Sequence, residues 1–301
     1  MKIILSPAKK MRMDADCICP TSRPVFLERA AEILRWMQSL SYVEAKKVWA
    51  CSDKIAEENY ARLQEMDLQD EAQLTPAILS YDGIAFQYMA PSVFEDEQFE
   101  YVQEHLRILS GFYGVLKPMD GVISYRLEMG AKVSGIASRA DVRAAKSPLL
   151  SENQDLAVYP QLADGQYFSE SSNPSVSNKL SSNLYDYWGD SLYREVCDDS
   201  GLIINLASKE YSLCIERYLQ PGDRFITCVF GELADPEQKK IVQKGVYAKM
   251  ARGDMVRFMA EQTIEEPERL KEYGRMGYHF SDERSTENEY VFIRETRGIA
   301  D

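Results

Sequence analysis

The chain has 301 residues, of which 45% are hydrophobic and 11% aromatic, so it can bury a large core. Its 35 basic and 48 acidic residues give a formal net charge of −13, which excludes a protein that coats nucleic acid with its whole surface but leaves room for a local basic cleft. No apolar run approaches the roughly 18 residues of a membrane span, and the N-terminal apolar stretch is too short for a signal-peptide core. We therefore expect a cytoplasmic protein with no membrane partner.

Cysteine and histidine usage bears on metals and disulfides. Six cysteines are scattered along the chain, and only His105 and His279 could join them in a metal site. No zinc-type spacing occurs, and the close pair Cys17 and Cys19 is typical of two free thiols in a reducing compartment. We predict no metal site, no bound cofactor and no disulfide framework.

Charge is segregated along the sequence. Residues 1–12 carry four bases and no acid, residues 53–104 carry thirteen acids and two bases, and residues 244–257 carry four bases and one acid. The two basic segments could meet in one positive groove after folding, or they could form solvated faces that never meet. Charge alone leaves both alternatives open.

The first elements follow from apolar patterning. Lys2–Leu5 is predicted to be a short buried strand that ends at Ser6 and Pro7, because proline removes a donor and biases its predecessor towards extended geometry. Apolar residues at three- and four-residue spacing predict a helix from Val25 to about Gln38 and a second from about Tyr42 to Met66.

A third helix is expected from a capping box. Ser92 and Glu95 have the spacing of that motif, and the apolar stripe behind them predicts a helix that ends at Ser110 and Gly111. The stripe itself is typical of a core-facing surface rather than a binding surface.

The amino-acid composition changes after Gly130. Serine- and asparagine-rich composition predicts a loop-rich insertion at about 137–182, with a short strand at Leu156–Tyr159. The later apolar segments are predicted to be strands at Leu202–Leu206, Phe225–Phe230 and Tyr290–Ile293 and a helix at Val246–Thr263. We expect a mixed α/β (α+β) fold, with residues 1–301 in a single large domain whose central β-sheet is surrounded by helices.

Six polar clusters stand beside apolar runs where a merely structural loop would have little use for them. They are Ser6–Lys9, Leu109–Gly114, Tyr125–Gly130, Tyr185–Gly189, Asn205–Tyr211 and Tyr247–Gly253. Together they resemble the YaaA peroxide-stress family over nearly the whole chain except 137–182. Leu213 stands where that family usually has a lysine, and Gly83–Phe86 replaces its Gly-x-Val-Tyr segment.

The resemblance implies a protein made under hydrogen peroxide stress that limits damage by free iron. It also implies double-stranded, sequence-tolerant DNA binding through a positive cleft and a helix-hairpin-helix element near 95–125. From the residues alone, Gly111 and Gly114 with Ser110 would allow a tight hairpin whose amides face a phosphate, although an ordinary glycine-rich helix end fits the same pattern.

The remaining clusters suggest a phosphate site with acid–base groups. Arg126 and Glu128 lie two apart and would share one side of an extended segment, either as site wall or as a structural pair. Glu210 follows a buried strand, a common place for functional loops. Lys249 and Arg252 are neighbours on one helix face, where they either hold a phosphate or are simply solvated. Arg257, five residues beyond Arg252, points away from that face.

Two functions remain in competition. The first is a DNA-binding stress protein whose cleft is lined by Lys9, Arg126, Lys249, Arg252 and Arg257. The second is an enzyme acting on a nucleotide or another phosphorylated small molecule, in which Glu128 or Glu210 handles protons. Direct iron sequestration ranks last, because the chain supplies few clustered ligands. We expect the six polar clusters to meet in one cleft, where a deep closed pocket would favour the enzyme and an open channel would favour DNA.

Overall fold

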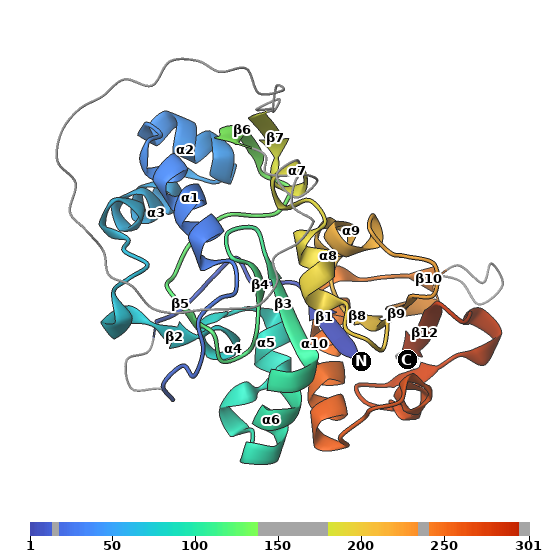
Figure 1. Cartoon of the computed structure of the whole chain (residues 1–301). Helices are drawn as coiled ribbons and strands as arrows, with labels where there is room; N and C mark the ends of the chain where they lie inside the picture. The colour runs from blue at the N-terminus through green and yellow to red at the C-terminus, as the bar shows by residue number, and fades with distance from the viewer. Residues whose placement is uncertain (14–17, 138–179, 234–240, 295–301) are drawn as a thin grey trace, which may run out of the picture.

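The computed structural model describes residues 1–13, 18–137, 180–233 and 241–294. They form a single α/β domain around a mixed eight-stranded sheet in the order β11-β12-β9-β8-β1-β3-β4, with β10 paired to β9 (Figure 1). The strands of this sheet are β1 (Lys2–Leu5), β3 (Leu106–Ser110), β4 (Gly114–Leu116), β8 (Leu202–Asn205), β9 (Arg224–Leu233), β10 (Ile241–Val242), β11 (Tyr278–Phe280) and β12 (Glu289–Arg294). This confirms the mixed α/β fold with a central sheet.

The centre of the sheet is parallel. Strands β3, β1, β8, β9 and β12 run in the same direction, whereas β4, β10 and β11 are antiparallel additions. From β1 the chain crosses to β3 on one side, whereas β8 and β9 continue the sheet on the other. The order therefore reverses between β1 and β8, and in such sheets the loops after the two strands diverge and leave a crevice at their carboxyl ends.

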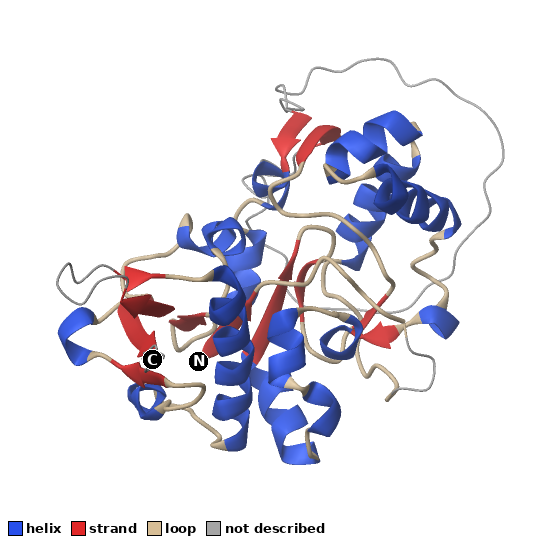
Figure 2. Cartoon of the chain, turned by 180° about the vertical axis from the view of Figure 1, so that it is seen from behind, coloured by secondary structure: helices blue, strands red, loops and turns tan. Residues whose placement is uncertain are grey.

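The helices cover both faces of the sheet. They are α1 (Leu27–Gln38), α2 (Tyr42–Trp49), α3 (Asp53–Glu65), α4 (Ala77–Ser80), α5 (Ile84–Met89), α6 (Asp96–His105), α7 (Leu184–Trp188), α8 (Ser191–Val196), α9 (Lys209–Glu216) and α10 (Gly245–Glu261). Helices α10, α6 and α5 pack together on one face, and α8 and α9 lie on the other (Figures 1 and 2). Helices α1 to α3 form a separate group beside the hairpin of β6 (Lys132–Ala137) and β7 (Leu180–Asn183), and a small sheet pairs β2 (Thr75–Pro76) with β5 (Gly121–Val122).

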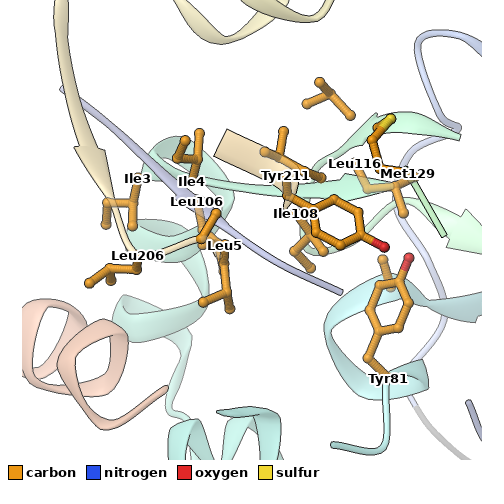
Figure 3. Packing of buried hydrophobic residues seen from close by; sticks show 14 of the residues in the cluster. Ile3, Ile4, Leu5, Tyr81, Leu106, Ile108, Leu116, Met129, Leu206 and Tyr211 are labelled. Carbon is orange, nitrogen blue, oxygen red and sulfur yellow. The ribbon is translucent and has the colours of Figure 1, made fainter. Parts of the chain in front are cut away.

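The core begins at the central strand. Ile3 and Ile4 are completely buried because β1 is covered on both faces, which explains its continuous apolar run. Figure 3 shows Leu5 and Leu206 at the ends of β1 and β8, beyond which Tyr211 turns its hydroxyl towards that of Tyr81. The apolar core thus gives way to polar groups at the carboxyl edge of the sheet.

Two predicted helices have different limits. The helix expected over Tyr42–Met66 is two helices, because Ala50 has a left-handed φ of 46° that ends α2 before α3 begins. The capping box is formed by Glu95 and Gln98 instead of Ser92 and Glu95, so α6 begins one turn later than predicted. In both cases a helix forms in the predicted region, but its limits differ from those predicted.

The helix-hairpin-helix expectation near 95–125 is not met. Helix α6 ends at His105, and the next five residues form β3, a parallel neighbour of β1 with every residue buried. A turn then leads to β4, so this segment is a helix followed by a β-hairpin. Apolar residues that fit a helix by spacing become a strand because pairing with β1 buries both of their faces.

The predicted insertion at about 137–182 falls mostly on residues 138–179, which lie outside the described residues together with the expected strand at Leu156–Tyr159. Its two borders are strands, since β6 and β7 pair Ala137 with Leu180. The described residues on either side of the stretch, Ala137 and Leu180, are therefore strand partners.

Candidate functional site

A cavity of about 410 Å³ lies at the carboxyl ends of β1 and β8, where the strand order reverses. It is lined by the loops that follow these strands, by the segment after Ser124 and by one side of α5 and α10. Six of the residues predicted from the sequence line it together: Lys9, Arg126, Glu128, Glu210, Lys249 and Arg252. Arg126 and Arg252, which are far apart in sequence, face the same hollow.

The charge of the cavity is opposite to that of the whole protein. Its lining contains five cations, since Lys10 joins the four named above, against the three carboxylates Asp82, Glu128 and Glu210. This surplus of two positive charges stands in a chain with a net charge of −13. Such a lining attracts anions into one place while the rest of the surface repels them.

Arg126 and Glu128 project from one extended segment, as their spacing predicted. The Glu128 carboxylate lies 2.8 Å from Lys9 Nζ and 3.6 Å from an Arg126 guanidinium nitrogen. The Trp49 indole N–H donates to the Arg126 carbonyl at 2.6 Å and fixes the backbone of the segment against α2. Arg126 and Glu128 therefore both line the cavity, and Trp49 holds the backbone of their segment.

The glycine-rich turn between β3 and β4 packs against the backbone of the segment that carries Arg126 and Glu128. A Cβ built on Gly111 would lie 2.7 Å from the Leu127 carbonyl oxygen, so only glycine permits the contact. The Ser110 hydroxyl accepts hydrogen bonds from the Phe112 and Tyr113 amides and bonds the Tyr125 hydroxyl at 2.6 Å.

Gly114 has a φ of +78° and packs against Phe26, Trp188 and Leu192. Ser110, Gly111 and Gly114 are therefore buried core residues, which corrects the expectation that they contact phosphate.

The tyrosines behind the segment are held as neutral phenols. Tyr125 bonds both Ser110 and Tyr81, and burial raises the pKa of Tyr125 to about 12. Burial also raises the pKa of Tyr211, which lines the cavity. At neutral pH these hydroxyls are hydrogen-bond donors rather than bases.

Lys249 and Arg252 are presented by α10. Gly253 allows α10 to approach the backbone of α5 closely, which brings the Arg252 side chain to the cavity wall. Arg252 Nε is buried without a hydrogen-bond partner, and no described residue forms an ion pair with Lys249 or Arg252. Burial lowers the pKa of Arg252, yet an arginine starts so high that it remains a cation at neutral pH. Arg257 lies outside the cavity, where its Nε donates to Glu261 at 2.6 Å.

Glu210 stands between this cavity and a smaller hollow. Its Oε1 accepts the Gly130 amide at 2.8 Å. The smaller hollow, of about 170 Å³, shares Arg126, Glu128 and Glu210 with the main cavity and is closed by Val48–Ala50 at the end of α2. These three shared side chains form a charged partition between the two hollows.

Several lining residues were not among the predicted site residues. Lys10 bonds Asp82 at 2.6 Å, and this bond together with that from Gln87 lowers the pKa of Asp82. Asp82 precedes Gly83, whose Cβ would meet Ala8, so this turn packs directly on the loop after β1. The Asp-Gly pair was a turn signal, but nothing in the sequence connected that turn to the first strand.

Four of the six polar clusters contribute to the lining. The clusters Leu109–Gly114 and Tyr185–Gly189 do not line it, although the Tyr185 hydroxyl donates to the carbonyl of the lining residue Glu210 at 2.8 Å. In the described part of the chain, no three histidine, cysteine or carboxylate side chains are grouped to hold a metal. The helices described are all too short or too polar to span a bilayer.

The fold and cavity define an α/β protein with a pocket lined by cations at the switch point of its sheet. The family described as peroxide stress protein YaaA matches residues 1–145 and 170–284. A UPF0246 protein of Agathobacter rectalis is 52% identical over 98% of this chain and 99% of its own length. UPF0246 proteins of Desulfitobacterium hafniense and Lachnoclostridium phytofermentans are 46% and 42% identical, each over at least 98% of both chains. The chain belongs to the YaaA peroxide-stress family.

Proposed function

We propose that this peroxide-stress protein works in the cytoplasm by binding a phosphorylated small molecule, such as a nucleotide, in the main cavity. The observation that carries the proposal is the Arg252 guanidinium, which lines the cavity beside Lys249 without a described partner. A partly buried cation with an unsatisfied nitrogen is costly unless something neutralises it, and a phosphate does so with charge-assisted hydrogen bonds. A phosphate monoester carries about two negative charges near neutral pH, which equals the surplus in the lining.

The size of the cavity favours a small ligand over a duplex. Its volume of about 410 Å³ lies within the usual range of roughly 300–1,000 Å³ for small-molecule sites. Part of the wall is apolar, with Leu5, Ile84, Phe86 and Leu206 beside the charged groups. A mixed wall suits a ligand that has both an anionic group and an uncharged body.

The same cavity supplies groups for catalysis. Glu128 lies between two cations and Glu210 also lines the cavity, so a bound ligand would meet two carboxylates and several cations that can bind phosphate. A carboxylate within reach of a substrate hydroxyl could accept its proton while the cations hold the phosphate. This arrangement supports an enzyme of phosphorylated substrates.

DNA binding is the second candidate, supported by the exposed lysines at the rim. The side chains of Lys9 and Lys10 are 67% and 77% exposed, and Lys249 is also exposed. These lysines could contact the phosphates of a DNA backbone across the mouth of the cavity without reading bases. Under either candidate, any limit on iron-driven damage is a downstream consequence of ligand binding.

Binding measurements on two arginines of one helix test the proposal. Purified protein is titrated by calorimetry with inorganic phosphate, with a panel of nucleotides and with a short duplex at low salt. Arg252→Ala should weaken phosphate and nucleotide binding by about tenfold or more, whereas Arg257→Ala, which alters a cation outside the cavity, should leave it unchanged.

Lys249→Ala, at an exposed position, repeats the test without altering a half-buried side chain. A folded wild-type protein that binds no phosphate compound at low salt would overturn the proposal. Tight duplex binding without nucleotide binding would establish the second candidate instead.

A further inference from the structure

The loops after β1 and β8 are joined by two serine side chains inside the main cavity. The Ser6 hydroxyl accepts the Ser208 amide at 2.8 Å and donates its own proton to the Ser208 hydroxyl oxygen at 3.1 Å. Both serines line the cavity and both are partly exposed to it. The contact lies at the reversal of strand order, where ligands bind in open parallel sheets.

One hydroxyl proton of this serine pair has no acceptor among the described residues. A serine hydroxyl has one proton, and the Ser6 hydroxyl donates its proton to Ser208. The Ser208 hydroxyl therefore accepts from Ser6 and keeps its own proton, for which the described residues provide no acceptor. A hydroxyl that accepts one hydrogen bond becomes a better donor, because such bonds polarise one another in a chain.

Ser208 does not have the usual role of its position. It is the N-cap residue of α9, where a serine side chain commonly accepts a backbone N–H of the first turn. Here the side chain makes no such bond and is turned to Ser6 instead. Ser208 therefore does not cap α9 through its side chain, and it lines the same cavity as Arg252.

We propose that Ser208 donates its hydroxyl proton to an oxygen of the ligand phosphate, and that Ser6 is the positioning residue that orients it. This inference rests on the proposed function and specifies it further. The phosphate would receive a neutral donor from the loop after β8 in addition to the cations of α10. The preferred ligand is then a phosphate ester or inorganic phosphate rather than a carboxylate, because a tetrahedral anion has oxygens enough for donors on several sides.

The test compares serine variants by calorimetric titration with inorganic phosphate and with acetate. Ser208→Ala should weaken phosphate binding on the order of tenfold, because it removes a hydrogen bond to a charged group, and Ser208→Thr should largely retain it. Ser212→Ala, on the same helix but outside the cavity, should bind as the wild type does. Thermal unfolding should differ little between Ser208→Ala and the wild type, because no cap hydrogen bond is lost and the partly exposed Ser6 hydroxyl can donate to water instead.

The role of Ser6 is tested by a double-mutant cycle. Ser6→Ala alone should weaken phosphate binding by about threefold, but Ser6→Ala combined with Ser208→Ala should be no weaker than Ser208→Ala, because Ser6 acts through Ser208. Additive losses would overturn the positioning role. Phosphate binding by Ser208→Ala equal to that of the wild type would overturn the donor role and leave the proposed function standing, whereas a wild type that binds no phosphate would overturn both.

Discussion

Gly253 of α10 packs against the carbonyl group of Ala85 in α5 so closely that a Cβ on the glycine would lie 1.8 Å from the Ala85 oxygen. The contact fixes the distance between the two helices, and it holds Arg252, the preceding residue, at the wall of the cavity. Gly253 is therefore a helix-packing residue. Packing and binding are therefore coupled at this point.

Gly253→Ala should destabilise the protein strongly. The clash is with backbone, so the helices must separate, and we expect a loss of more than about 3 kcal/mol with a fall in thermal midpoint of more than about 6 °C. Gly245→Ala is the matched control, because nothing lies within 4 Å of its Cβ at the start of the same helix. Calorimetric unfolding of the two variants makes the comparison, and equal midpoints would show that the helices are not in close contact.

Glu128→Gln should strengthen the binding of inorganic phosphate. The substitution removes the negative charge beside Lys9 and Arg126 and raises the surplus of the lining from two charges to three. We expect affinity to rise about fivefold, equivalent to ~1 kcal/mol at partly solvated distances. Glu57→Gln, at an exposed position on α3, is the control in the same titration. Weaker binding by Glu128→Gln would mean that the carboxylate orients Arg126 more than it competes with the ligand.

The buried thiols should resist modification by alkylating agents. Burial raises the pKa of Cys214 and of Cys228 to about 12, so at pH 8 only on the order of 10⁻⁴ of each is thiolate, the reactive form. Cys19, which is exposed, should react within the usual time for a free thiol. Mass spectrometry after iodoacetamide treatment at pH 7, 8 and 9 measures this, with denatured protein as the control in which all three react. Rapid native labelling of Cys214 would show that α9 opens readily.

Replacing residues 138–179 by a two-residue Asn-Gly turn should leave the domain folded. Ala137 and Leu180 are paired across β6 and β7, so a tight hairpin turn can join them without moving either strand. We expect a change in thermal midpoint of less than about 4 °C and unchanged phosphate binding. A large fall in midpoint would show that the removed segment contributes to the packing of the domain.

Duplex DNA, if it binds, should do so through few phosphates. With Lys9, Lys10 and Lys249 exposed at the mouth of the cavity, log K should fall with log salt at a slope of about −3. Lys249→Ala should reduce that slope by about one unit for unrelated sequences alike, whereas Arg257→Ala should not change it. Fluorescence anisotropy across a salt series provides the slopes. A slope reduced equally by Arg257→Ala would move the DNA site away from the cavity.

Local sequence patterns predicted much of the fold and four of the cations that line the cavity. The apolar run of β1 and the helical spacing around Arg252 predicted elements that the structure contains, because local periodicity reports directly which faces are buried. The charge pattern and polar clusters predicted Lys9, Arg126 and Arg252 as candidates that would meet.

Tertiary structure decided which of these residues meet and which segment lies beneath them. Residues 106–110 have a spacing that fits a helix, and they became β3 only because β1 offered a partner that buries both faces. Ser110 and Gly111 are consequently buried in the core. Arg257 forms an ion pair with Glu261 outside the cavity. The Ser6–Ser208 bond joins residues 202 positions apart, and it exists because β1 and β8 are neighbours. A sequence pattern records local burial, whereas strand pairing depends on the free energy of the whole sheet, and only the folded chain reveals it.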